Sequence, residues 1–271
     1  NLTGYNLLTP EVGYPKALDA ANRALAIDPK NAMAYSVLGW TAMMNDGGLA
    51  VAAKYLERAM ELEPTNISII GHTADLVMRL GRLNEAIKLG EYVAARDPVN
   101  PVGHLNLSGY YLLAGRLDEA IASSRIANSL SPGIGGAHYR LGEALLRKHE
   151  PEAALAAFQQ EEDDEWRVKG TTLALHDLER LTEYEEAFTE LRKRWGARWP
   201  VEVAHVYAWI GDADEVFSWL EKELEANGLG GVMVDNFFTN LHDDPRWPSL
   251  LEKAGVSANQ LDAIEFNVTM P

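Results

Sequence analysis

The sequence predicts an all-α fold, a solenoid of stacked antiparallel helix pairs, and three observations predict it. The heptapeptide GRLNEAI at residues 81–87 returns 34 residues later as GRLDEAI at residues 115–121. Prolines 29, 64, 98 and 132 each follow an alanine by twelve residues, and they step by 35, 34 and 34 residues. Between these prolines and the next turn, apolar or small residues recur at i, i+3, i+4 and i+7, the pattern of one buried helical face.

The first helix of each unit carries that pattern in four places. The quartets are Tyr35, Leu38, Gly39 and Ala42; Ile70, Thr73, Ala74 and Val77; His104, Leu107, Ser108 and Tyr111; and His138, Leu141, Gly142 and Leu145. A short polar turn follows, where Gly81 and Gly115 can take the left-handed conformation that ends a helix.

The second helix of each unit carries a small residue where the two helices must cross closely. These residues are Ala17, Ala52, Ala86, Ala120, Ala154 and Ala187. The proline then ends the helix, because it lacks an N–H and disfavours helical geometry in its predecessor. A pair of this size cannot bury its own apolar face, so neighbouring pairs must stack.

These residues resemble the tetratricopeptide repeat (TPR), whose pattern is W-x2-L-G-x2-Y, then A-x3-F, then P. Leu38-Gly39 and Leu141-Gly142 fill the Leu-Gly positions, Tyr111 and Tyr207 the tyrosine position, and Phe158 the phenylalanine position. Tyr35, Ile70, His104 and His138 replace the tryptophan. The resemblance implies a right-handed superhelical α-solenoid that binds proteins or peptides and is not an enzyme.

We expect residues 1–271 to form a single solenoid, with regular repeats over 1–160, degenerate repeats over 161–230 and capping helices over 231–271. The register breaks where Trp166 stands in place of the next proline, directly after the acidic run Glu161–Glu165. Such a run is most often a solvated helix end or loop. Asp244-Pro245 predicts the start of a terminal helix that ends near Ala254.

A narrower resemblance concerns VYAWIGDADEVFSWLE at residues 206–221 and DPRW at residues 244–247. These segments are similar to the carboxyl-terminal repeats of bacterial multidomain regulators that carry class III adenylyl cyclase, TolB-like or winged-helix domains. The resemblance implies the interaction or sensory arm of a larger signalling protein. We expect a cytoplasmic location, or a periplasmic one if the parent protein has an upstream transmembrane helix or signal.

Composition excludes several classes of function. The formal net charge of −16 and a pI of about 4.8 argue against nucleic acid and anionic membrane surfaces as partners. Cysteine is absent, and no two histidines have the i, i+3 or i+4 spacing of a helical metal site, so we expect no metal.

Phosphate-loop, hydrolase and kinase motifs are absent, so we expect no catalytic residues and no cofactor. The alternative, an enzyme with a site in residues 161–200, stays open.

In the TPR family the stripe one residue beyond each quartet lines a concave groove. Here the resemblance places on that stripe Ser36, Trp40 and Met43; Gly71, Asp75 and Met78; Leu105, Gly109 and Leu112; and Tyr139, Glu143 and Leu146. Aromatic and methionine side chains with a few carboxylates suit an apolar or basic peptide segment. No lysine lies on the stripe, so the lysine–asparagine clamp with which some family members bind a terminal carboxylate is missing.

Two alternatives remain for these residues and for the chain. Met43, Met78, Leu112 and Leu146 form one apolar column, which is also the pattern of packing between successive repeats. A second function of a different class is self-assembly into a homo-oligomer, through Trp199, Trp209, Trp219 or the incomplete first repeat.

Overall fold

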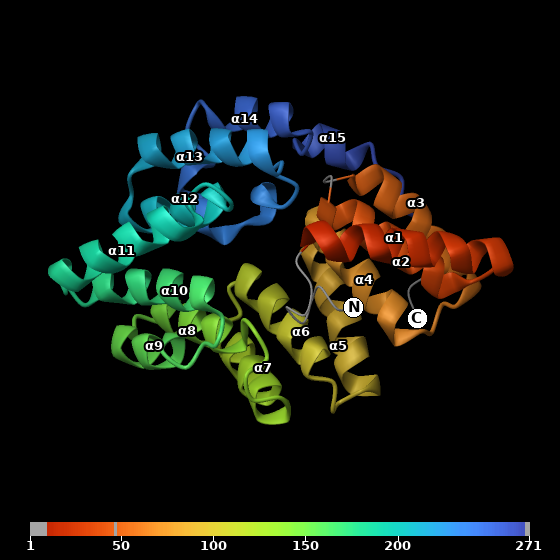
Figure 1. The fold of residues 1–271 in the computed structure, drawn as a ribbon, viewed down its shortest axis with the longest axis horizontal. Coiled ribbons are helices and arrows are strands. Elements are labelled where there is room, and N and C mark those ends of the chain that lie inside the picture. The colour runs from red at the N-terminus through yellow and green to blue at the C-terminus, as the bar shows by residue number, and fades with distance from the viewer. Residues whose placement is uncertain (1–9, 46–47, 269–271) are drawn as a thin grey trace.

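The computed structural model describes residues 10–45 and 48–268, and the regular structure in this part of the chain is entirely helical. The helices follow one another around a ring (Figure 1). Their bounds are α1 Pro10–Ile27, α2 Ala32–Asn45, α3 Leu49–Leu62, α4 Ile67–Arg79, α5 Leu83–Arg96, α6 Pro101–Leu113, α7 Leu117–Leu130, α8 Ala137–Arg147, α9 Pro151–Phe158, α10 Asp164–Asp177, α11 Leu181–Trp195, α12 Pro200–Ile210, α13 Ala213–Ala226, α14 Trp247–Ala254 and α15 Ala258–Asp262, with 3-10 helices η1 Val232–Val234 and η2 Asn236–Leu241.

Consecutive helices form antiparallel pairs, as the repeat predicts. The pairs are α2 with α3, α4 with α5, α6 with α7, α8 with α9, α10 with α11, and α12 with α13. First helices of neighbouring pairs also contact one another, α2 with α4, α6 with α8, α8 with α10 and α10 with α12, and the first helices together form an inner layer. The predicted fold class is confirmed.

The core follows four of the six predicted alanine positions, whereas Ala17 and Ala187 are half-buried. Ala52, Ala86, Ala120 and Ala154 have no exposed surface, because each lies where the second helix of a pair crosses the first. One hydrophobic cluster extends from Ala32 in α2 to Phe266 after α15. The repeats from α2 onward therefore share one main core, and a smaller separate cluster of Ala21, Ala34 and Leu38 joins α1 to α2.

The turns within the helix pairs confirm the predicted left-handed residues. Gly81 has a φ of +78° and Gly115 a φ of +69°. One period after Gly115 the chain has His149, which takes the same conformation with a φ of 60°. An L-amino acid is strained there, since its Cβ approaches the following carbonyl oxygen.

The carboxyl-terminal end closes the ring. After α13 the chain turns inward through η1 and η2, and α14 and α15 then lead back to the first repeats (Figure 1). Arg82 Nη1 donates to the carbonyl of Phe266 at 3.2 Å, and the backbone N–H of Asn267 donates to Glu57 Oε1 at 3.2 Å. Helix α14 begins at Trp247, two residues later than expected, because Asp244 accepts hydrogen bonds from both the backbone and the guanidinium of Arg246 and so holds a turn there.

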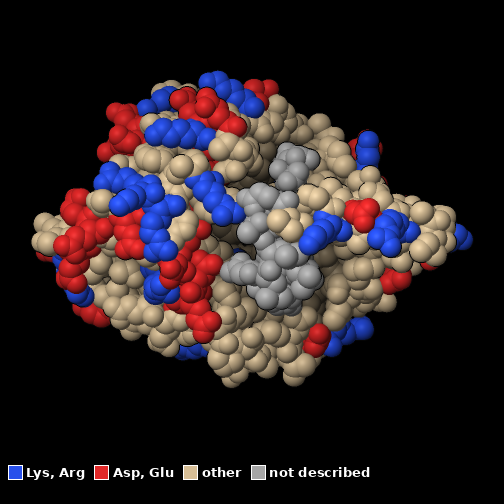
Figure 2. All heavy atoms as spheres, in the orientation of Figure 1, with Lys and Arg blue, Asp and Glu red and all other residues tan. Residues whose placement is uncertain are grey.

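Charged side chains are unevenly distributed. On the face seen in Figure 2, they gather over the carboxyl-terminal half of the ring, whereas the amino-terminal repeats show few. None of the described helices is long and apolar enough to cross a bilayer.

Exchanging residues at the left-handed turn positions tests whether these positions require glycine. Replacing His149 by glycine should raise the free energy of unfolding by about 1 kcal/mol, because it removes the left-handed strain. Replacing Gly115 by alanine should lower it by about the same amount; a Cβ at Gly115 meets no atom within 4 Å, so conformation is the only cost. Urea denaturation measures both. Equal stabilities for His149→Gly and the parent protein would contradict the assignment of a strained left-handed conformation to His149.

Candidate binding groove

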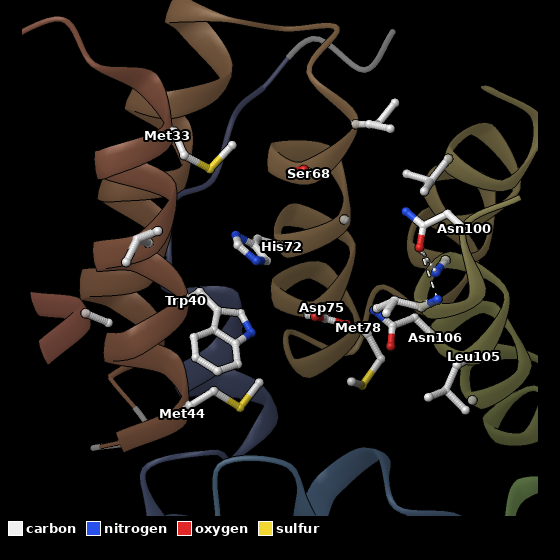
Figure 3. Close-up of a pocket in the computed structure, with 18 of the residues that line it drawn as sticks. Met33, Trp40, Met44, Ser68, His72, Asp75, Met78, Asn100, Leu105 and Asn106 are labelled. Carbon is white, nitrogen blue, oxygen red and sulfur yellow. Dashed lines mark hydrogen bonds between the residues drawn. The ribbon is translucent and has the colours of Figure 1, made fainter. Parts of the chain in front are cut away.

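The inner layer of the first repeats encloses a groove of about 1030 Å³. Helices α1, α2, α4 and α6 line it, and Ile134, Gly135 and Arg140 lie at its far end. Figure 3 shows the side chains that α2, α4 and α6 direct into it. The groove lies on the concave side because the first helix of every pair faces inward.

One wall of the groove is apolar. Trp40 and Met44 come from α2, Met78 from α4 and Leu105 from α6 (Figure 3). The indole of Trp40 lies 5.8 Å from the ring of Tyr14 and 5.9 Å from that of His72 between ring centroids, so its orientation is fixed from two sides.

His72 adds no charge to this wall at neutral pH. Its Nδ1 lies 2.7 Å from Ser36 Oγ, and burial lowers its pKa to about 4. The neutral ring therefore acts as part of the aromatic surface beside Trp40.

The groove also holds a charged cluster beside these apolar side chains, and Arg79 Nη2 lies 3.6 Å from the sulfur of Met44. Asp75 Oδ1 accepts a hydrogen bond of 2.5 Å from the hydroxyl of Tyr110. Arg79, the last residue of α4, and Arg140 of α8 are close enough to oppose the rise in the pKa of Asp75 that burial causes. The cluster thus contains two guanidinium groups and one carboxylate.

Asn106 of α6 is a polar residue of the groove. Figure 3 shows it pointing from α6 toward α4. Its amide makes no hydrogen bond with any residue that the structure describes, whereas Asn100 caps α6 through Val102 N at 3.1 Å. Asn106 therefore offers both a donor and an acceptor to a bound chain.

The structure divides the residues that the sequence places on the concave stripe into three groups. Trp40, Asp75, Met78 and Leu105 line the open groove, together with Gly71 and Gly109. Ser36, Met43, Leu112 and Leu146 lie behind it in the core. Tyr139 and Glu143 are buried in the next part of the solenoid, on α8.

The chain's own residues 229–241, here the returning segment, cover the inner layer of that next part and also touch α4 and α6. Asn236 donates to the carbonyl of Leu112 at 3.1 Å and accepts from Arg147 Nη2 at 2.7 Å. The ring of Phe237 stacks on His205 of α12 at 4.5 Å between centroids and packs against Trp209. The concave surface of this half is thus already occupied.

A buried ionic network holds the returning segment in place. His205 Nε2 lies 2.9 Å from Asp235 Oδ2, and Glu202 pairs with both Lys169 and His205. Burial would lower the pKa of His205, but Asp235 and Glu202 outweigh it and raise the pKa to about 9. The two cations and two carboxylates balance, so the network carries no net charge.

The acidic run Glu161–Glu165 is not simply a solvated loop. Glu161 is 2% exposed, and its Oε2 accepts from the backbone N–H groups of Gly136 and Tyr139 at the start of α8. Asp163 caps α10 in the same way. Carboxylates at helix amino termini satisfy free N–H groups, which explains why acidic residues stand at this turn between α9 and α10. No cluster of potential metal ligands exists among the described residues.

The tryptophans considered for self-assembly are all half-buried. The indole N–H of Trp209 donates to Asp177 at 2.8 Å, and that of Trp219 donates to Glu215 at 3.2 Å. Trp199 is packed beside Arg198.

Comparison with known proteins agrees with this geometry. A tetratricopeptide repeat model matches residues 73–133, which include α5, α6 and α7. The fold is a TPR solenoid. No curated protein matches the chain.

Several solved TPR-type structures resemble the whole arrangement. A chain of the APC/C hetero-tetramer Cut9–Hcn1 gives a TM-score of 0.63 at 15% identity, over 86% of this chain and 48% of that one. PilF of Pseudomonas aeruginosa gives 0.53 at 18% identity, over 79% and 93%. TTC0263, a TPR protein of Thermus thermophilus, gives 0.52 at 18% identity, over 78% and 100%. At these identities the likeness concerns the fold.

Sequence reasoning missed groove residues that lie outside the single stripe. Two further columns of the repeat also face inward. The first stands two positions after the first residue of each quartet and contains Val37, His72, Asn106 and Arg140. The second stands nine positions after that residue and contains Met44, Arg79 and Leu113. Counting these columns along the 34-residue period would have found Arg79, Asn106 and Arg140. The groove is wider than one stripe because a helix directs more than one row of side chains toward it.

The buried network predicts a pH dependence. Because the folded pKa of His205 is about 9 against an unfolded value near 6.5, its stabilisation is complete below pH 6.5 and is lost as the pH rises through 9. Unfolding free energies from urea titrations should fall by about 3 kcal/mol between pH 6.5 and pH 10 on this account.

The control is Asp235→Asn, which removes the carboxylate that raises this pKa. Its stability should fall at a lower pH than that of the parent protein. Parallel pH profiles for the two proteins would contradict the role of the His205–Asp235 pair.

Proposed function

We propose that this chain is a non-catalytic scaffold that binds an extended segment of a partner protein in the groove across α2, α4 and α6. The observation that carries the proposal is the contrast between the two halves of one concave surface. The returning segment covers the inner layer from α8 to α12 and touches α4 and α6, whereas the rest of the surface from α2 to α6 leaves about 1030 Å³ open.

The contacts of the returning segment indicate how a partner would bind. There an aromatic side chain stacks on the inner layer and an asparagine side chain exchanges hydrogen bonds with it. The open half offers the same kinds of group: Trp40, Met44 and Met78 for an apolar side chain, and Asn106 for a backbone amide. A partner side chain would thus take the place that Phe237 occupies farther along.

The TPR fold is one that binds proteins, and the similar Cut9–Hcn1 chain belongs to a complex of two different proteins. We further propose, from the resemblance of residues 206–221 and 244–247, that the chain is the interaction or sensory arm of a larger bacterial regulatory protein. The charges in the groove favour an apolar and acidic partner segment over a basic one, because Lys16, Arg79 and Arg140 outnumber Asp75.

Replacing Trp40 by alanine tests the groove directly. Peptides selected by the parent protein from a random displayed library should bind Trp40→Ala about ten to a hundred times more weakly, the usual cost of removing a central aromatic contact. Isothermal titration calorimetry measures the change, and a far-ultraviolet spectrum checks that the variant is folded.

The matched control is Trp219→Ala, which removes an equally large, half-buried indole from α13, outside the groove. It should leave peptide affinity unchanged. Equal affinity for Trp40→Ala and the parent protein would show that the peptides bind elsewhere. Failure to select any peptide would argue against a peptide-binding function.

A further inference from the structure

We propose that the groove recognises an acidic side chain of its partner, an aspartate or glutamate whose carboxylate binds the guanidinium groups of Arg79 and Arg140. This inference rests on the proposed function, and it names the chemistry of the bound segment. The sequence alone suggested an apolar or basic segment.

Both arginines lack the partners that such groups normally have. Among the described residues, nothing accepts a hydrogen bond from Nε of Arg79 or Nε of Arg140, although both atoms are shielded from solvent. The hydrogen bond that Arg79 makes is a weak one, from Nη2 to the sulfur of Met44 at 3.6 Å. A shielded guanidinium N–H without an acceptor is costly, so an anion that reaches this place gains strong hydrogen bonds.

Asp75, the carboxylate of the cluster, does not form an ion pair with either guanidinium group. Asp75 is engaged by the hydroxyl of Tyr110 at 2.5 Å, and it forms no salt bridge within 4.0 Å of either arginine. Two positive groups therefore share one negative group, and the cluster keeps a net positive charge while Asp75 is ionised.

The half of the solenoid that the returning segment covers contains an arginine that corresponds to Arg79. Arg147 lies two periods after Arg79, in the same column of the repeat. Its Nε pairs with Glu143 at 3.1 Å, and its Nη2 donates to the side-chain oxygen of Asn236 in the returning segment at 2.7 Å. An arginine in this column thus binds a side-chain oxygen of the segment that lies in the groove. Within residues 10–45 and 48–268, Arg79 makes neither contact.

Charge complementarity points to the same ligand. The charged side chains that line the groove are Lys16, Asp75, Arg79 and Arg140, so the groove is cationic in a chain whose formal net charge is −16. A carboxylate is attracted to this local excess, while the surrounding negative charge disfavours nonspecific binding of anions elsewhere.

Gly109 gives Arg140 the space to lie against α6. A Cβ at Gly109 would lie 2.1 Å from Nη1 of Arg140, so any larger residue must displace that guanidinium. Gly109→Ala therefore moves one of the two arginines without changing any charge, and alanine is favoured over glycine within a helix.

The test is a parallel selection from a random displayed peptide library with the parent protein, Arg79→Gln/Arg140→Gln, and the matched double variant Arg58→Gln/Arg96→Gln. The last removes two exposed arginines from α3 and α5, so it has the same net charge. The parent protein and the matched variant should enrich apolar peptides that contain Asp or Glu. The groove variant should keep the apolar preference and lose the acidic one.

Synthetic peptides from the selection provide the quantitative test. Asp→Asn or Glu→Gln in a selected peptide should weaken binding to the parent protein about tenfold or more, and should change binding to Gly109→Ala and to the arginine variant by less than about twofold. The NMR signals of the arginine Nε–Hε groups should shift with the acidic peptide and not with its amide form.

The outcomes separate the two proposals. Selected peptides without acidic residues would overturn the carboxylate site and leave the peptide-binding function standing. An acidic preference that persists in Arg79→Gln/Arg140→Gln and in Gly109→Ala would place the anion elsewhere and also overturn the inference. If no peptide is enriched by any of the proteins, the proposed function fails, and the carboxylate site fails with it.

Discussion

The close crossing of two helices at an alanine is the constraint on which the rest of this molecule depends. Ala52, Ala86, Ala120 and Ala154 have no exposed surface, and a larger side chain at any of them would separate the pair that it joins. Because four successive pairs, from α2–α3 to α8–α9, cross in this way, their first helices face the same side. The layer of first helices forms a shared core on its outer side and a concave surface on its inner side.

The ring closure gives the two halves of the concave surface different roles. Residues 229–241 return to the inner layer and bind it through Asn236, Phe237 and the His205–Asp235 pair. The groove between α2 and α6 remains open beside them. A solenoid of this length could expose one long concave surface, but here the returning segment covers part of it and leaves the first repeats open.

The residues that repeat and the residues that do not repeat serve different purposes. Gly81, Gly115 and the alanine column recur because every pair needs the same turn and the same crossing. The inward positions vary from repeat to repeat: Trp40, Asp75, Gly109 and Glu143 occupy one column, and Met44, Arg79, Leu113 and Arg147 another. Variation within these columns places an apolar wall beside a cationic cluster, and this combination sets the chemistry that the groove can bind.

By itself the sequence determined the helix pairs, their order, the turn glycines and the alanine crossings, because these depend on contacts within one or two periods of the chain. It also located Trp40, Asp75, Met78 and Leu105 on the inner side. Only the tertiary structure decided that Glu161 caps α8, that residues 229–241 fill half of the concave surface, and that Arg79 and Arg140 meet at Asp75 without pairing. These features depend on the curvature summed over many repeats, which brings distant residues together and which no local periodicity records.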